Sequence, residues 1–249
     1  MTKTAIVTGA ARGIGLATTK LFLEEGRRVA MIDRDADVLA EEAAKLEGVL
    51  PVVCDVSIPE QVDAMVAQVT AEFGRIDALV NNAGVADFGP IEDTTFARWR
   101  TVMQTNLDGV FLCTQACIPA LRQAKGAIVN IASISGLRAS NLRVAYGTSK
   151  AAVIQLTLQQ AVELGEFGIR ANVVAPGPVR TKLAMAVHTQ EIIDAYHDAI
   201  PLNRYGSEDE IGNVIVFLCS DKASYVTGQL IASDGGFEAT GIGLPALRG

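Results

Sequence analysis

A glycine-rich turn near the N-terminus constrains the fold of this chain more than any other feature. Residues 4–8 form a short apolar, β-branched run, and residues 9–15 follow at once with glycines in the pattern G-x-x-x-G-x-G. Residues 16–25 then have helical periodicity. A strand, a glycine turn and a helix in this order are the context of a dinucleotide-binding site, because the glycines let the backbone approach a pyrophosphate and the helix N-terminus offers it free N–H groups. A glycine turn without a ligand is the alternative.

The rest of the chain repeats the alternation of strand and helix. Such an alternation predicts parallel βαβ units in a doubly wound α/β sheet, and we assign residues 1–249 to one domain. Ligands of such sheets lie at the carboxyl ends of the strands. The further strands are expected at 28–32, 50–54, 77–80, 127–131, 168–174 and 229–233, and the helices at 35–46, 58–73, 96–121, 145–166 and 207–219.

An acidic residue, Asp33, ends the second predicted strand about 20 positions after the glycine turn, where a carboxylate can accept hydrogen bonds from an adenosine ribose. The same carboxylate would repel a 2′-phosphate, so we expect NAD rather than NADP. Arg12 and Arg34 lie close enough in sequence to compete for a phosphate, which leaves NADP open. Without a ligand, Asp33 would cap the next helix.

Tyr146 and Lys150 are four residues apart in a predicted helix, so their side chains share one face. A phenol titrates near pH ~10, and a nearby ammonium favours the phenolate. Such a pair can exchange a proton with an alcohol oxygen, although the spacing alone also fits an exposed amphipathic helix. Asn106 lies in the middle of another predicted helix, where asparagine is unfavourable, and indicates a kink or a functional amide.

The composition excludes several classes of protein. The net charge of −7, with no cluster of basic residues, argues against a nucleic-acid binder. No apolar run reaches the ~20 residues of a membrane span, and no signal peptide is visible. The four cysteines include no C-x-x-C, so Cys113 and Cys117 are interpreted as core residues and no metal site is assigned. These features favour a cytoplasmic protein.

The conjunction of motifs is more specific than any one of them, and together they resemble the short-chain dehydrogenase/reductase family. The resemblance covers the chain from Thr4 to about Gly236. It implies one Rossmann domain with about seven parallel strands between two layers of helices, an NAD(P) cofactor and a homotetramer. The motifs are Thr8-Gly9-x-x-x-Gly13-x-Gly15, Asp55, Asn81-Asn82-Ala83-Gly84, Asn106, Ser133, Tyr146-x-x-x-Lys150 and Pro176-Gly177.

The resemblance also implies residue roles. Tyr146 would exchange the proton with the substrate oxygen, Lys150 would bind the nicotinamide ribose and lower the tyrosine pKa, and Ser133 would donate a hydrogen bond to the substrate oxygen. Asn106 would hold a water in a proton relay through Lys150. The other implied cofactor contacts are Gly9, Arg12, Gly13, Ile14 and Gly15 for the pyrophosphate, Asp33 for the ribose, Asp55 and Val56 for the adenine, Asn82, Ala83 and Gly84 for the adenosine side, and Pro176, Gly177, Val179 and Thr181 for the nicotinamide.

The expected function is NAD(H)-dependent interconversion of a secondary alcohol, such as a polyol, sugar or hydroxy acid, and its ketone. An NADPH-dependent reductase of 3-oxoacyl thioesters is the alternative enzyme, and an NAD-sensing protein is the alternative outside enzymes. The substrate pocket is expected to draw on Ile134, Ser135, Leu137, Arg138, Asn141, Leu142 and a helical lid at 180–205. Arg138 would pair with a substrate carboxylate or face solvent, and His188 and His197 are interpreted as lid surface. The tail, residues 237–249, has no clear period.

Two long predicted helices, 99–121 and 145–166, are apolar on more than one face. A helix that is apolar all round must be buried, and the sheet covers only one of its sides. We therefore expect these helices to pair with a second subunit in a dimer within a tetramer. The candidate contacts are Leu107, Val110, Phe111, Leu156 and Leu158.

Overall fold

The computed structural model describes residues 2–181, 185 and 188–241, and within them the chain forms a seven-stranded parallel sheet. The strand order β3-β2-β1-β4-β5-β6-β7 reverses direction between β1 and β4, as a doubly wound sheet requires. The predicted α/β fold is confirmed. The strands are β1 (Thr4–Thr8), β2 (Arg28–Asp33), β3 (Val49–Val53), β4 (Ala78–Asn81), β5 (Ala127–Ile131), β6 (Arg170–Pro176) and β7 (Leu230–Ser233).

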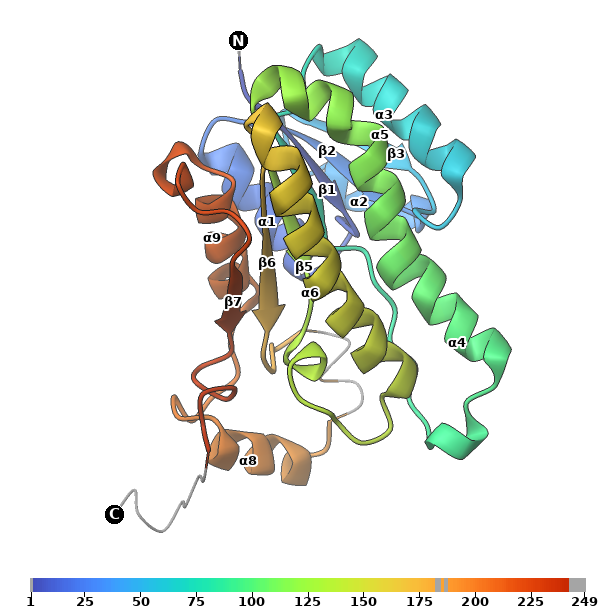
Figure 1. Ribbon diagram of the computed structural model, residues 1–249, viewed down its shortest axis with the longest axis vertical. Coiled ribbons are helices and arrows are strands. Elements are labelled where there is room, and N and C mark those ends of the chain that lie inside the picture. Colours follow the sequence, from blue (N-terminus) through green and yellow to red (C-terminus); the bar gives the residue numbers. More distant parts are fainter. Residues whose placement is uncertain (1, 182–184, 186–187, 242–249) are drawn as a thin grey trace.

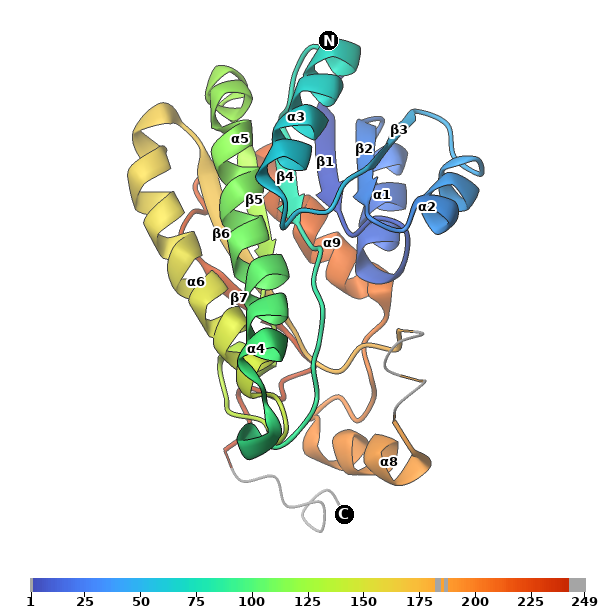
Figure 2. The same ribbon diagram turned by 90° about the vertical axis from the view of Figure 1, so that its right-hand side faces the viewer.

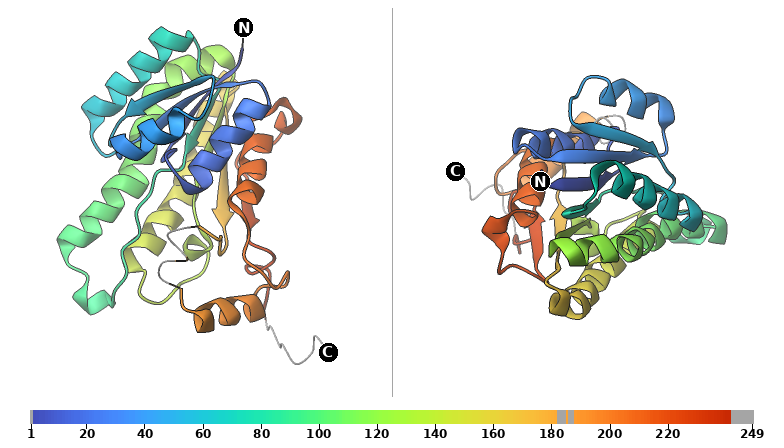
Figure 3. Two further views of the ribbon diagram at one scale, coloured as in Figure 1. Left: turned by 180° about the vertical axis from the view of Figure 1, so that it is seen from behind. Right: turned by 90° about the horizontal axis from the view of Figure 1, so that it is seen from above.

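Helices cover both faces of the sheet (Figures 1 and 3). One face packs against α1 (Gly13–Glu24), α2 (Ala36–Ala43) and α9 (Glu208–Leu218). The other packs against α3 (Pro59–Phe73), α5 (Gly109–Ala124) and α6 (Val144–Leu164). Because the central strands are buried on both faces, they are continuous apolar runs rather than alternating ones. Val110 of α5 is 3% exposed and belongs to this core, so its prediction as a subunit contact was wrong.

The carboxyl end of the sheet is surrounded by α4 (Phe96–Met103), α8 (Gln190–Ala199) and loops (Figure 2). Of residues 180–205, only α8 forms a regular helix in the described part, and residues 182–184 and 186–187 of the predicted lid lie outside it. Short 3-10 turns at Ile91–Asp93, Ile134–Gly136, Gly165–Phe167 and Asp221–Ala223 complete the elements.

The kink expected at Asn106 is a π-helical turn, Gln104–Asp108, that joins α4 to α5. The backbone N–H of Gly109 bonds to the carbonyl oxygen of Gln104 five residues earlier. A β-carbon on Gly109 would lie 2.8 Å from Cγ2 of Val56. The absence of a side chain at Gly109 therefore allows the turn to lie against the loop after β3.

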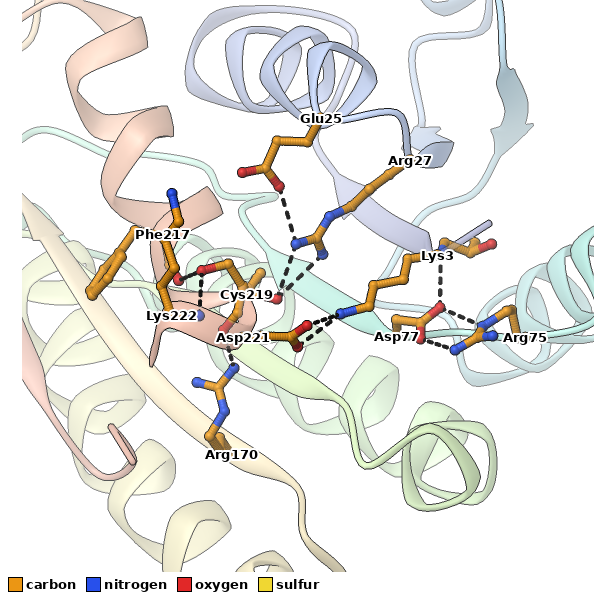
Figure 4. A network of polar contacts seen from close by, with 12 residues as sticks. Lys3, Glu25, Arg27, Arg75, Asp77, Arg170, Phe217, Cys219, Asp221 and Lys222 are labelled. Carbon is orange, nitrogen blue, oxygen red and sulfur yellow. Dashed lines mark hydrogen bonds and ion pairs between the residues drawn. The ribbon is translucent and has the colours of Figure 1, made fainter. Parts of the chain in front are cut away.

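A polar network ties together the amino ends of the strands, opposite the carboxyl edge (Figure 4). The Asp77 carboxylate accepts hydrogen bonds from Arg75 and from the backbone N–H of Thr4, both 2.8 Å long. The Arg170 guanidinium donates to the carbonyl oxygens of Leu218, Ser220 and Val226. Such bonds satisfy carbonyl groups that would otherwise be buried without partners, so this edge has a structural role.

No helix among the described residues is both long and apolar enough to cross a lipid bilayer.

Candidate active site

The glycine turn is held against the end of β4 by Asn82. Its side-chain amide donates to the carbonyl oxygens of Thr8, at 2.9 Å, and Gly9, at 3.1 Å. The Thr8 hydroxyl accepts the backbone N–H groups of Asn82 and Ala83, both at 3.0 Å. A β-carbon on Gly15 would lie 2.2 Å from the Gly9 carbonyl oxygen, so no other residue fits there. These residues therefore shape the turn.

The amino end of α1 remains open to a ligand. Gly13 has a φ of +58° and begins the helix, and a β-carbon on it would meet only Oε1 of Glu208, 3.7 Å away. No side chain caps the helix at Arg12, whose guanidinium is ion-paired with Asp35 instead. The first N–H groups of an uncapped helix bind anions. The turn at Gly13 and Ile14 thus fits a dinucleotide pyrophosphate.

Asp33 does not cap the next helix, which corrects the alternative drawn from the sequence. Asp35 is the N-cap of α2, and its carboxylate accepts the N–H of Val38. Asp33 instead accepts the backbone N–H groups of Ala11 and Asp35, both at 3.1 Å. Its half-buried carboxylate therefore lies directly against the glycine turn.

The two residues after β3 with expected adenine contacts, Asp55 and Val56, differ in burial. Burial acts to raise the pKa of the Asp55 carboxyl, but hydrogen bonds from Ser57 and the charge of Arg34, 4.0 Å away, leave that pKa lowered. The Val56 side chain is 6% exposed and packs in the core. Asp55 thus carries a charge at the carboxyl edge, whereas the Val56 side chain is structural.

The segment after β6 is tied to its neighbours by backbone bonds. The N–H of Gly177 donates to the carbonyl oxygen of Ser233, and a β-carbon on Gly177 would lie 2.6 Å from Cβ of Asp234. Val179 is 6% exposed and pairs with Gly206. The N–H of Thr181 donates to the Val179 carbonyl oxygen at 2.8 Å. The chain from Pro176 to Thr181 therefore continues from β6 at the carboxyl edge, where the nicotinamide contacts are predicted.

Ser133 and Tyr146 meet at the same edge. Ser133 follows β5 and is buried, and its hydroxyl accepts the N–H of Ser135 at 3.1 Å. Tyr146, in the first turn of α6, is half-buried. Burial raises the pKa of the Tyr146 phenol, while a hydrogen bond with the Ser133 side chain and the charge of Arg143 act to lower it. The net direction is upward, contrary to the lowering expected from Lys150, so Tyr146 keeps its proton at neutral pH.

Lys150 lies one turn further along α6 and is 4% exposed. Its Nζ donates to the carbonyl oxygen of Ile131 at 2.7 Å and lies 5.9 Å from the centroid of the Tyr146 ring. Burial lowers the pKa of Lys150 to about 8. A β-carbon on Gly84 would lie 3.5 Å from this Nζ and 3.3 Å from Oδ1 of Asn106. The glycine therefore brings the backbone after β4 close to both side chains.

The Asn106 side chain links the loop after β4 to α6. Its amide donates to the Val85 carbonyl oxygen at 2.9 Å and to the Ser149 hydroxyl at 3.0 Å, and its oxygen accepts the Val85 N–H at 2.8 Å. The Ser149 hydroxyl in turn donates to the Tyr146 carbonyl oxygen at 2.7 Å. Both amide N–H groups are therefore used, and the contacts of Asn106 position α6. No sequence pattern around Asn106 indicates Val85 or Ser149, which lie 21 and 43 positions from it.

The Asn81 side chain, the first of the Asn81-Asn82-Ala83-Gly84 motif, forms its hydrogen bonds inside the core. It donates to Asn130 at 2.8 Å and to Thr114 at 3.2 Å. Asn130 donates onward to Thr157 and Gln160, at 2.9 and 2.7 Å. All five residues are at most 7% exposed. Asn81 thus belongs to a buried polar cluster beneath α6.

Arg138 is exposed to solvent, as one of the two expectations had it, and its guanidinium already pairs with a carboxylate of this chain. Its Nε lies 2.6 Å from Oε2 of Glu238, and its guanidinium also donates to the Thr240 carbonyl oxygen. The described part of the tail, residues 237–241, is therefore fastened to the loop after Ser133; residues 242–249 lie outside the described part.

The two histidines pack in an aromatic cluster beyond the carboxyl edge. Nδ1 of His188 lies 3.0 Å from the Tyr205 hydroxyl, and its ring stacks on Tyr196 at 5.6 Å. The His197 ring meets Tyr205 edge-on, at 5.5 Å. Tyr196 also contacts Phe237 of the tail. The segment carrying α8 is thus connected to the tail by ring contacts.

Comparisons with known proteins find relatives over almost the whole chain. A family model described as enoyl-(acyl carrier protein) reductase matches residues 9–238. A 3-oxoacyl-[acyl-carrier-protein] reductase of Thermotoga maritima is 41% identical over 94% of this chain and 97% of its own. A 2-(R)-hydroxypropyl-CoM dehydrogenase of Xanthobacter autotrophicus is 39% identical over 96% of this chain and 100% of its own.

Among solved structures, levodione reductase has a TM-score of 0.92 at 34% identity and covers 96% of this chain and 98% of its own. The fold, the arrangement of Ser133, Tyr146 and Lys150, and these relatives point to one group of enzymes, oxidoreductases that act on CH–OH groups with a nicotinamide cofactor. The chain belongs to the short-chain dehydrogenase/reductase family.

Proposed function

We propose that this enzyme interconverts a secondary alcohol and the corresponding ketone with NAD(H). The observation that carries the proposal is the convergence of Ser133, Tyr146 and Lys150 at the carboxyl edge of the sheet, the edge that also holds the uncapped amino end of α1. An acid/base pair next to a dinucleotide cradle is the arrangement that hydride transfer at a carbinol carbon requires.

Each side chain has a distinct part in the reaction. The bound nicotinamide supplies or accepts the hydride. Tyr146, protonated because its pKa is raised, donates its proton to the carbonyl oxygen during reduction and takes it back during oxidation. Ser133 donates a hydrogen bond to the same oxygen as negative charge develops on it. Lys150, charged at neutral pH, stabilises the phenolate that remains on Tyr146.

The preference for NAD rests on the surroundings of Asp33. Its carboxylate lies against the glycine turn, where an adenosine ribose would hydrogen-bond to it and a 2′-phosphate would be repelled. Arg12 and Arg34, the two cations that could instead hold a phosphate, face Asp35 and Asp55, respectively. The negative charges around this position therefore favour the cofactor without a phosphate.

Reduction of 3-oxoacyl thioesters with NADPH is the second candidate. The name of the relative from Thermotoga maritima favours it, and the same Ser133, Tyr146 and Lys150 would serve that reaction. The charge at Asp33 argues against NADPH, so the two candidates differ in cofactor as well as in substrate.

The experiment that tests the proposal is a screen of initial rates in both directions. Secondary alcohols, polyols and hydroxy acids are offered with NAD⁺ or NADP⁺, and their ketones and acetoacetyl thioesters with NADH or NADPH. Turnover of a free alcohol or ketone with NAD(H) at the higher kcat/KM supports the first candidate. A higher kcat/KM for the thioester with NADPH replaces it with the second, and cofactor binding without any turnover favours an NAD-sensing protein.

The expected tetramer and cytoplasmic location belong to the same proposal. A groove along α5 and α6, lined in part by Leu107, Phe111, Leu112 and Leu156, supports pairing with a second copy. The four cysteines are free and buried, which is consistent with a reducing compartment.

A further inference from the structure

Arg143 places a cation at the mouth of the candidate active site. It immediately precedes α6, three residues before Tyr146, so both side chains fall on one side of the first turn. Its guanidinium carbon lies 5.9 Å from the centroid of the Tyr146 ring and 4.8 Å from that of the Phe88 ring. The aromatic rings hold the guanidinium by cation–π contacts, which leave N–H groups for another partner.

No carboxylate pairs with Arg143 among the residues that the structure describes. Its neighbours around the carboxyl edge differ in this respect, since Arg98 binds Asp87 at 2.8 Å, Arg138 binds Glu238 and Arg204 binds Glu210, both at 2.6 Å. The side chain of Arg143 is half-buried. A partly desolvated cation without a counter-ion is unfavourable, which makes it a candidate for binding a ligand.

The backbone before Arg143 is held in a conformation that costs energy. Leu142 has a φ of +63°, in the left-handed region that side chains other than glycine rarely adopt. The N–H of Gly89 bonds to the Leu142 carbonyl oxygen at 3.0 Å, and the N–H of Gly147 bonds to that of Arg143 at 2.7 Å. These bonds hold the backbone at Leu142 and Arg143 and so fix the direction in which the Arg143 side chain starts from it. Retained strain of this kind concentrates at functional sites.

The remaining charges near Arg143 leave an excess of positive charge. The Asp87 carboxylate, on the loop that contacts Arg143 through Phe88, is already paired with Arg98. Burial and the charge of Arg143 lower the pKa of His188, so this histidine is neutral at pH 7 and adds no second cation. A single guanidinium in this setting suits one oxyanion group, which it can bind through two parallel N–H···O bonds.

We propose that Arg143 recognises an oxyanion, a carboxylate in the simplest case, that the substrate carries a few bonds from its carbinol carbon. This inference rests on the proposed function, because it names the class of alcohol that reacts at Tyr146. It makes the substrate a short hydroxy acid or oxo acid rather than a neutral polyol or sugar. Phosphate or sulfonate would satisfy the same guanidinium, and the choice among the three is decided by the test.

The test compares acetoacetate with its neutral ethyl ester, and wild type with Arg143→Gln and Arg143→Lys. In wild type we expect kcat/KM for the acid to exceed that for the ester, chiefly through a lower KM. Arg143→Gln should lower kcat/KM for the acid about 10- to 100-fold more than for the ester, the range for one hydrogen-bonded charged group. The ester should change only through the charge of Arg143 on the pKa of Tyr146, which acts on both substrates alike. Arg143→Lys should restore part of the loss. Arg122→Gln is the matched control, because Arg122 also lies over an aromatic ring, Phe167, but in the last turn of α5.

A binding measurement separates failure of this inference from failure of the proposed function. Calorimetric titration of the NAD-bound enzyme with 3-hydroxybutyrate, malonate, inorganic phosphate and methanesulfonate reports oxyanion binding without turnover. Binding of at least one of them that is lost in Arg143→Gln upholds the inference even if no ketone is reduced. Three results overturn the inference: equal binding by wild type and Arg143→Gln, no binding by either, or turnover of the ester with no effect of Arg143→Gln on the acid. The proposed function is then still decided by the screen of initial rates.

Discussion

The ammonium of Lys150 donates a hydrogen bond of 2.7 Å to the carbonyl oxygen of Ile131, the last residue of β5. This bond anchors the charged side chain of Lys150, on α6, to the end of β5. Ser133 follows two residues after that end. The Lys150 side chain is buried, and burial lowers its pKa to about 8 from the 10.5 that is usual for lysine. The hydrogen bond fixes the position of the charge, and the loss of solvent around it lowers the pKa.

Stability should therefore depend on pH through Lys150. Between about pH 8 and 10.5 the unfolded chain binds a proton at this lysine that the folded chain does not, so Lys150 makes the free energy of unfolding rise with pH across that window. The shift corresponds to about 3 kcal/mol. Raised pKa values of buried cysteines and of Tyr205 act in the opposite direction but are common to wild type and variant. The difference in stability between wild type and Lys150→Met, measured by urea unfolding from pH 7 to 10.5, should show the rise.

The exposed Lys20→Met variant serves as the control and should show no such rise in its difference curve. If the difference in stability between wild type and Lys150→Met does not change with pH, the pKa of Lys150 in the folded protein is ordinary and the account is contradicted. Lys150→Met should also lose most activity, since the charge that stabilises the Tyr146 phenolate is gone.

Replacement of Asp33 should change the choice of cofactor. Asp33→Ser removes the charge that would repel a 2′-phosphate and the acceptor expected to bind the ribose. We expect the ratio of kcat/KM for NAD to that for NADP to fall by about 10- to 100-fold, the range for hydrogen bonds to a charged group. Steady-state kinetics with both cofactors measure the ratio, with Asp37→Ser, an exposed carboxylate in the first turn of α2, as the control. An unchanged ratio would contradict the role given to Asp33.

The sequence predicted the order of the elements well because the signals are local. The glycine turn, the apolar strands and the asparagine in the middle of a predicted helix are each recognised from a few neighbouring residues. The kink predicted at Asn106 is observed as the π-helical turn. The misassignments involve contacts between distant parts of the chain. Arg138 binds Glu238, 100 positions away, and no pattern around Arg138 indicates it. The alternative in which Asp33 caps α2 was wrong for a local reason, because Asp35, two residues later, accepts the N–H of Val38.

Assembly should depend on the groove between α5 and α6. Phe111 is 48% exposed on this surface, although it is a large apolar side chain. We expect light scattering to give about four times the chain mass of 26.2 kDa for wild type and a smaller species for Phe111→Glu, because a buried charge destabilises the interface. Ile91→Glu, which alters an exposed apolar residue elsewhere, should leave the mass unchanged. A monomeric wild type at micromolar concentration would contradict the predicted tetramer.

The polar cluster beneath α6 should contribute to stability. Asn130→Ala removes the donor to Thr157 and Gln160 and the acceptor for Asn81, all of them buried. The orphaned groups should lower the free energy of unfolding by about 2–5 kcal/mol, measured by urea denaturation. Thr101→Ala, which removes an exposed hydroxyl bonded to the Ala97 carbonyl oxygen, should change it by less than about 0.5 kcal/mol. A loss for Asn130→Ala no larger than that of Thr101→Ala would show that the cluster is dispensable.

The central claim is that Tyr146 exchanges the proton with the substrate oxygen, and kcat/KM of Tyr146→Phe tests it most directly. The substitution keeps the ring that packs beside Arg143 and removes only the hydroxyl. With folding checked by circular dichroism, and with Tyr225→Phe, a fully exposed tyrosine, as the control, we expect the loss of a positioned acid/base to lower kcat/KM by about 10²–10⁴-fold on any substrate that turns over. A folded Tyr146→Phe enzyme that keeps more than about a tenth of the wild-type kcat/KM, well outside that range, would contradict the account.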